Sequence, residues 1–76
     1  MEKIDFHKLI KIAVENEICK FSDPRGVLLR SVDYNMDYLL ELYFNKENIS
    51  QEEVDFVKKE FVNWLNINYK TIYIRK

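Results

Sequence analysis

The stretch MDYLLELYF, residues 36–44, fits two kinds of secondary structure, and the choice between them decides the fold. One set of its residues recurs at the spacing of a helix face: Met36, Leu39, Leu40 and Tyr43. Another set alternates, as in a half-buried strand: Tyr38, Leu40, Leu42 and Phe44. The segments on either side therefore have to decide which pattern governs.

Two flanking segments have clear helical patterns. Residues 3–18 place apolar side chains on one stripe and charged ones opposite, and Asp5 puts a negative charge near the expected helix start. A second helix is expected from about residue 50 to residue 66. Ser50 and Glu53 have the spacing of a capping box, in which each residue satisfies a free backbone N–H of the first turn.

Two other segments favour extended structure, and two favour turns. GVLLRSVDY (26–34) has β-branched residues and leucines and lacks a helix cap ahead of it. It follows SDPRG (22–26), a predicted turn in which Gly26 tolerates a positive φ. DYNMD (33–37) is rich in turn-formers, and YKTIYIRK (69–76) alternates as a strand does. The sequence thus predicts strands before and after the second long helix.

The flanking strands favour the extended form for residues 36–45 as well. If that stretch were helical, the two other strands would form an isolated pair, which is marginal in water unless helices cover it. We therefore predict a single domain over residues 1–76 with an α+β fold in the order α-β-β-α-β. A three-stranded, mainly antiparallel sheet would carry two helices on one face.

The predicted sheet leaves one face uncovered. Tyr38, Leu40, Leu42 and Phe44 would point toward the helices. The opposite face would carry Arg30, Leu39, Tyr43, Tyr73 and Arg75. Exposed aromatic and arginine side chains are typical of a protein-binding surface, although cross-strand packing alone explains aromatic residues on strands equally well.

The residues needed for catalysis are scarce. His7 and Cys19 are the only histidine and cysteine, and the single glycine excludes Gly-rich phosphate loops. His7 is expected to be a surface or half-buried side chain, and Cys19 a buried structural thiol. The sequence predicts no enzyme and no cofactor, because one histidine and one cysteine cannot supply a nucleophile with its base or a metal site.

The start of the second long helix offers another set of contacts. Glu52, Glu53 and Asp55 suit a helix N-terminus electrostatically, and an ion-binding role would need carbonyl ligands that this segment lacks. Phe56 and Ile67 fall on the polar side of that helix. They are either exposed contacts or pack against the chain termini.

Composition and charge narrow the partners. Twelve Lys and Arg balance thirteen Asp and Glu, and a formal charge of −1 argues against strong binding to nucleic acid or to a membrane surface. Neither a signal peptide nor a membrane-spanning apolar run is expected. With one cysteine, no intrachain disulfide forms, and a reducing cytoplasmic location is expected.

Several motifs together resemble a family of small bacterial immunity proteins, found beside polymorphic or contact-dependent growth-inhibition toxins. The motifs are LLRSV, LELYF, ISQEEVDFV and a closing YIR, and they lie within residues 28–75. The resemblance implies a domain that binds a toxin's active domain stoichiometrically and blocks it. It implies contacts through Arg30, Tyr43, Tyr73 and Arg75, or through Glu52, Asp55 and Phe56.

The sequence therefore favours a cytoplasmic protein-binding module, most specifically one that neutralises a toxin. A small nucleic-acid-binding regulator from a phage or mobile element is the alternative, and it requires binding that weakens with salt. A homo-oligomeric structural subunit is the third hypothesis, with self-association through the sheet face or an edge strand.

Overall fold

The computed structural model describes residues 3–68, and this part of the chain is built from helices alone. The helices are α1 (Phe6–Glu15), α2 (Arg25–Tyr34), α3 (Met36–Phe44) and α4 (Gln51–Asn68). Since no strand occurs in residues 3–68, the predicted α+β fold with a three-stranded sheet is wrong. The segment expected to form the last strand, residues 69–76, lies outside the described residues.

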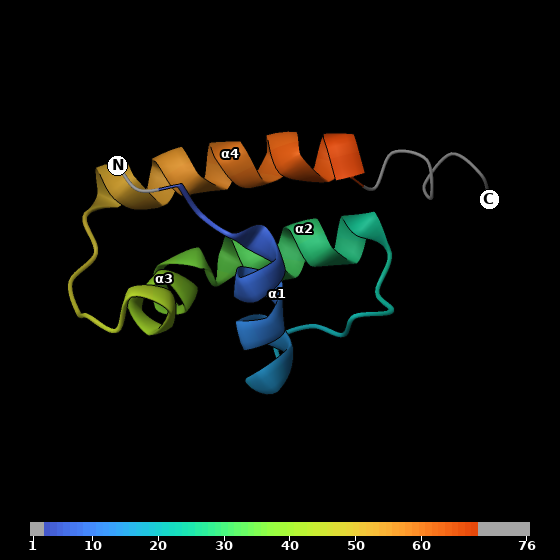
Figure 1. Cartoon of the computed structure of the whole chain (residues 1–76), viewed down its shortest axis with the longest axis horizontal. Coiled ribbons are helices and arrows are strands. Elements are labelled where there is room, and N and C mark those ends of the chain that lie inside the picture. Colours follow the sequence, from blue (N-terminus) through green and yellow to red (C-terminus); the bar gives the residue numbers. More distant parts are fainter. Residues whose placement is uncertain (1–2, 69–76) are drawn as a thin grey trace.

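The four helices pack around one core (Figure 1). The longest, α4, extends along one side of the molecule, and α2 and α3 follow one another beneath it. α1 crosses in front and packs mainly against α3, while Phe6 at its start reaches the rings of α4. The longest connection between helices runs from residue 16 to residue 24.

α1 forms where the sequence predicts a helix, although it is shorter than residues 3–18. Asp5 is its N-cap: the Asp5 carboxylate accepts hydrogen bonds from the backbone N–H groups of His7 (3.1 Å) and Lys8 (3.3 Å). Such a cap satisfies donors that would otherwise lack a partner in the first turn. The buried side chains are those of the predicted stripe: Phe6, Leu9, Ile10 and Ala13.

α2 replaces the strand predicted for residues 26–34. Pro24 is its N-cap residue and supplies no side-chain hydrogen bond, but its carbonyl accepts from the N–H groups of Val27 and Leu28 at 3.0 Å each. Gly26 lies in the first turn of the helix and does not have a positive φ, so the turn conformation predicted for it is wrong. Leu28 and Val32, one turn apart, point into the core.

α3 is the opening stretch, and it is helical. Met36, Leu39 and Leu40 are fully buried, as the helical spacing requires, and a strand could not bury both of the adjacent leucines on one face. Asn35 separates α3 from α2 with φ −107°, so it is not left-handed, and its side-chain Nδ2 donates to the Ser31 carbonyl at 2.7 Å. The predicted hairpin turn is thus a one-residue break between two helices.

α4 confirms the second predicted helix. The Ser50 hydroxyl accepts a hydrogen bond from the Glu53 N–H at 3.2 Å, which is one half of the predicted capping box. Its buried residues are Val54, Val57, Phe61 and Leu65. Phe61 and the half-buried Trp64 pack against Phe6 of α1, with ring centroids 5.4 and 5.7 Å away respectively. These aromatic contacts fix α1 against α4.

Candidate protein-binding surfaces

The outward half of α3 carries two exposed apolar side chains. Tyr38 is 47% exposed and Leu42 is 39% exposed, and they lie one turn apart on the same side of the helix. Asp37 and Glu41 precede them in the sequence and form a parallel row. We call these four residues the α3 face. Two exposed apolar side chains one turn apart make this face a candidate contact surface, because the outward side of a surface helix is usually richer in polar residues.

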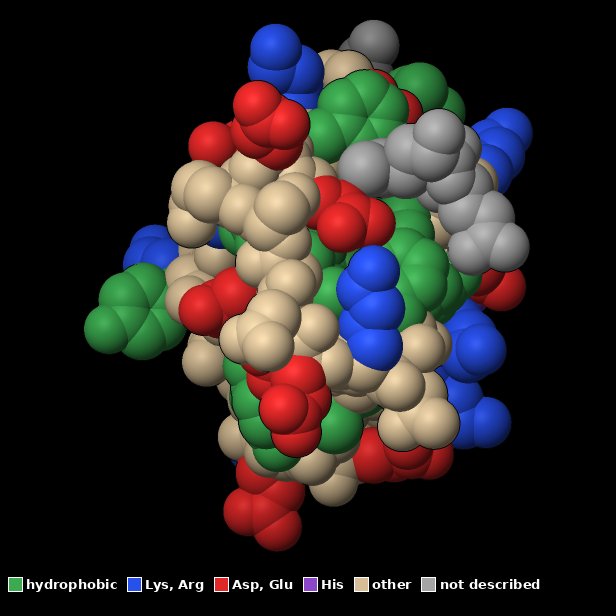
Figure 2. Space-filling view, turned by 90° about the vertical axis from the view of Figure 1, so that its left-hand side faces the viewer, with side chains coloured by type: hydrophobic (Ala, Val, Ile, Leu, Met, Phe, Trp, Pro, Cys, Tyr) green, Lys and Arg blue, Asp and Glu red, His purple; other side chains and the backbone are tan. Residues whose placement is uncertain are grey.

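The two carboxylates of the α3 face have no cationic partner within residues 3–68. Asp37 accepts a hydrogen bond from the N–H of Tyr38 at 2.8 Å, which is a local contact in the first turn. Figure 2 looks at the molecule from the left-hand side of Figure 1 and shows acidic and basic side chains interspersed with exposed hydrophobic ones. The surface is therefore mixed in charge, and the acidic character of the α3 face is local.

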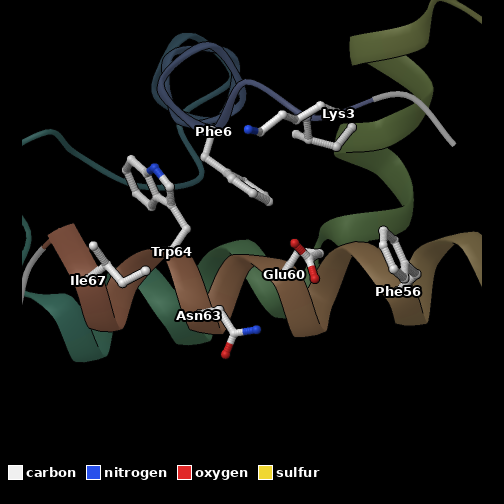
Figure 3. A pocket seen from close by; sticks show the side chains of 8 residues that line it. Lys3, Phe6, Phe56, Glu60, Asn63, Trp64 and Ile67 are labelled. Atoms are coloured by element: carbon white, nitrogen blue, oxygen red, sulfur yellow. The ribbon is translucent and has the colours of Figure 1, made fainter.

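A second surface is an open groove beside α4 (Figure 3). It has a volume of about 380 Å³ and lies between the segment that precedes α1 and the outward side of α4. Its lining is mainly apolar: Lys3, Ile4, Phe6, Phe56, Glu60, Asn63, Trp64 and Ile67. We call it the α4 groove.

The outward side of α4 has a regular order of side chains along the groove. Phe56 and Ile67 mark its two ends, and they are 48% and 78% exposed. Glu60 and Asn63 lie between them. The sequence left open whether Phe56 and Ile67 are exposed contacts or pack against the chain termini. Both are exposed, and packing against residues 69–76 lies outside the described residues.

The sheet residues predicted to bind a partner are not brought together. Leu39, expected to be exposed, is completely buried, so its assignment to a contact surface is wrong. Tyr43 is half-buried: its hydroxyl accepts from the N–H of Asp5 at 2.9 Å, and its ring lies 5.0 Å from the Lys8 ammonium. Arg30 is exposed as predicted, but on α2. Tyr73 and Arg75 lie outside the described residues.

The predicted contacts on α4 are all exposed. Glu52 and Asp55 are both exposed in the first turns of the helix, and Asp55 accepts from the Gln51 side chain at 2.9 Å. Phe56 lies nearby at one end of the α4 groove. The three predicted contacts on α4 are therefore exposed, whereas within residues 3–68 the predicted sheet face loses Leu39 to the core.

The side chains of Cys19 and His7 lie in different surroundings: the first is buried and the second is exposed. Cys19 is buried, as predicted, and burial raises the pKa of its thiol, with the nearby Asp23 carboxylate acting in the same direction. His7 is exposed, and its ring centroid lies 5.0 Å from that of Trp64 in an edge-to-face arrangement. Within residues 3–68, no group of three or more His, Cys, Asp or Glu side chains is placed to hold a metal ion, and no helix has the length and apolar character needed to cross a membrane.

Sequence reasoning missed Tyr38 and Leu42 as contacts, because the strand pattern turned both toward the helices. The signal that identifies them is the helical spacing of their neighbours. Once Met36, Leu39 and Leu40 are placed in a core, positions 38 and 42 must face outward.

Comparisons of the chain with protein-family models, curated proteins and solved structures found no significant match.

Proposed function

We propose that the chain is a protein-binding module, and that the α3 face is the surface that contacts its partner. The observation that carries the proposal is the pair of exposed apolar side chains, Tyr38 and Leu42, on a helix whose other side fills the core. Tyrosine in particular combines a large apolar ring with a polar tip, and it is enriched where proteins bind one another.

The charge of the α3 face indicates which kind of partner it fits. Asp37 and Glu41 accompany the two apolar side chains, and no described lysine or arginine neutralises them. A protein surface with lysine or arginine around an apolar patch would bury Tyr38 and Leu42 and pair with both carboxylates. The proposed partner is therefore a basic protein surface.

A toxin domain is the specific partner that the sequence resemblance supports. The mechanism is then stoichiometric: the module covers a site that the toxin needs, and it performs no chemistry of its own. Of the motifs behind the resemblance, LLRSV and LELYF are helical here, while ISQEEVDFV contains the helix start of α4. A cytoplasmic location belongs to the same proposal and rests on the single, unpaired cysteine.

The proposal is tested by capture from cells with a matched set of variants. The tagged chain, a Tyr38→Ser/Leu42→Ser double variant and a Phe21→Ser control are expressed in the native organism. Phe21 is 65% exposed and lies in the connection between α1 and α2, so its replacement removes an exposed aromatic ring away from the α3 face. We expect a basic protein to be retained in equal amount by the wild-type chain and the control, and to be lost from the double variant.

A captured protein is then tested for toxicity. Its expression alone should arrest growth, and co-expression of the wild-type chain should restore growth where the double variant does not. Retention of the partner by the double variant at wild-type levels would remove the α3 face from the proposal. Growth that continues when the captured protein is expressed alone would remove the toxin.

A further inference from the structure

We propose that the α4 groove receives the α4 helix of a second copy of this chain, in antiparallel orientation, so that the protein forms a weak symmetric dimer. The inference goes beyond the proposed function and uses a different surface. It starts from the order of four exposed residues of α4 that line the groove, which are Phe56, Glu60, Asn63 and Ile67.

The spacing of these four residues is that of a helix–helix seam. They follow one another by four, three and four positions, as the a and d positions of a heptad do. The pattern therefore places all four on one line along the outward side of α4. A partner helix laid along this line would meet each of them in turn.

Two copies of this set of four residues are complementary when a two-fold axis relates them. When a second α4 runs in the opposite direction, centred between Phe61 and Val62, each Phe56 lies opposite Ile67 of the other copy. Each Glu60 then lies opposite Asn63 of the other copy. The apolar side chains pair with apolar ones at both ends, and in the middle an amide donor faces a carboxylate acceptor twice.

A parallel arrangement lacks this match. It would place Glu60 directly opposite Glu60 of the second copy, with like charges in contact, and would leave the two Asn63 amides to pair with each other. The charge pattern thus selects the antiparallel orientation. It also favours a second copy over an unrelated helix, because the required sequence of partner residues is the one that α4 itself contains.

The size of the contact predicts its strength. Covering Phe56 and Ile67 in two copies removes on the order of 500 Å² of apolar surface from water. The neighbouring groove residues add to this area, and a specific interface needs about 1,000 Å² in total. A dimer of this size should dissociate in the micromolar range and form at high protein concentration.

The orientation is tested by disulfide cross-linking between copies. Phe56→Cys and Ile67→Cys proteins are mixed and oxidised, and each variant is also oxidised alone. Phe56 lies about 16 Å along the helix from Ile67, so in the antiparallel dimer a Cys at 56 can reach only a Cys at 67 of the other copy. We expect the mixture to cross-link and each variant alone to stay uncross-linked. The wild-type chain, whose Cys19 is buried, is the background control.

The polar centre is tested with two substitutions at one exposed position. Asn63→Lys places an ammonium opposite Glu60 of the second copy and should tighten the dimer several-fold in sedimentation equilibrium. Asn63→Glu opposes two carboxylates and should weaken it several-fold. Within a single helix, Lys59 and Glu60 precede position 63 by four and three residues, and they act in opposite directions on a lysine or a glutamate placed there. The free energy of unfolding of each variant is therefore measured beside its dimer affinity, so that an effect on helix stability is separated from an effect on the dimer.

Three results would overturn the inference. The first is a chain that remains monomeric at millimolar concentration. The second is cross-linking of Phe56→Cys with itself in preference to the mixed pair. The third is a dimer whose strength is the same with lysine and with glutamate at position 63.

Discussion

The hydroxyl of Tyr43, in the last turn of α3, accepts a hydrogen bond of 2.9 Å from the backbone N–H of Asp5, the residue that caps α1. This bond joins the start of α1 to the end of α3 through two residues that are 38 positions apart in the sequence. The Lys8 ammonium lies 5.0 Å from the centre of the same ring, so Tyr43 contacts α1 at two points. A residue that was expected to meet a partner instead holds the two helices together.

Removal of the Tyr43 hydroxyl should therefore weaken the fold. We expect Tyr43→Phe to lower the free energy of unfolding by about 0.5–1 kcal/mol, measured by urea denaturation, because the ring stays and only the hydrogen bond is lost. Tyr38→Phe is the matched control, since the Tyr38 side chain is exposed and should lose nothing measurable. Equal stability of the two variants would contradict a structural role for the bond.

The helical assignment of residues 36–44 predicts a difference between neighbours. Leu39→Ala should cost about 2–5 kcal/mol, because it opens a cavity in the core, while Tyr38→Ala should change stability by less than about 0.5 kcal/mol. A strand in the predicted orientation would reverse the order of the two. Thermal denaturation followed by circular dichroism measures both variants, and a larger loss at Tyr38 than at Leu39 would show that the stretch is not the helix described.

Gly26 offers a test of the start of α2. An added Cβ would meet nothing within 4 Å, and the residue is in a helical turn without a positive φ. Gly26→Ala should therefore raise the free energy of unfolding by about 0.5–1 kcal/mol, because alanine has the higher helix propensity and the unfolded chain loses freedom. The turn predicted from the sequence, with positive φ at Gly26, would make the same substitution destabilising.

The Cys19 thiol predicts a dependence of stability on pH. Burial and the charge of Asp23 raise the thiol pKa in the folded chain above its unfolded value. The protonated thiol is thus favoured by folding: this contribution is complete below the ordinary thiol pKa of about 8.5 and is lost as pH rises through the folded value. The wild-type chain should lose stability more steeply between pH 8 and pH 10 than Cys19→Ala. If the free energy of unfolding fell equally with pH in the two chains, the thiol would make no contribution to the pH dependence.

The sequence alone was sufficient to predict α1 and α4, the first and last helices of the chain. At the start of α1, Asp5 has the expected negative charge, and the stripe from Phe6 to Ala13 has one period that fits only a helix. At α4, Ser50 supplies the predicted cap and Phe61 and Leu65 the predicted core face. In both helices the local signals and the apolar period agree, so tertiary packing had nothing to overrule.

The local sequence features of α2 and α3 did not predict that these segments are helical. α2 begins at Pro24 without a side-chain cap and contains β-branched residues, and α3 follows a run of turn-formers around Asn35. These features favour extended structure one by one. What overrules them is burial of Leu28, Val32 and Met36, which recur every four residues across the break at Asn35. That period spans two elements, and it becomes visible only when the segments are considered together.

The misplaced contact residues follow from the same error. In the predicted strand, Tyr38 pointed toward the helices and Leu39 pointed to the uncovered face. In α3 the two residues also point in different directions, but Leu39 is buried in the core and Tyr38 is exposed. The predicted surface therefore fails for its three described members together: Leu39 is buried, Tyr43 packs against α1, and Arg30 lies on α2. Glu52, Asp55 and Phe56 kept their predicted exposure because their helix had been assigned correctly.

The short connections between the helices have a consequence for kinetics. The connections between helices are at most nine residues long, and most contacts join residues that are close in the sequence, although α1 packs mainly against α3. Chains of this topology reach the native state within microseconds to milliseconds, since little loop-closure entropy is lost before contacts form. A newly made chain would thus complete its helical core within a very short time of leaving the ribosome.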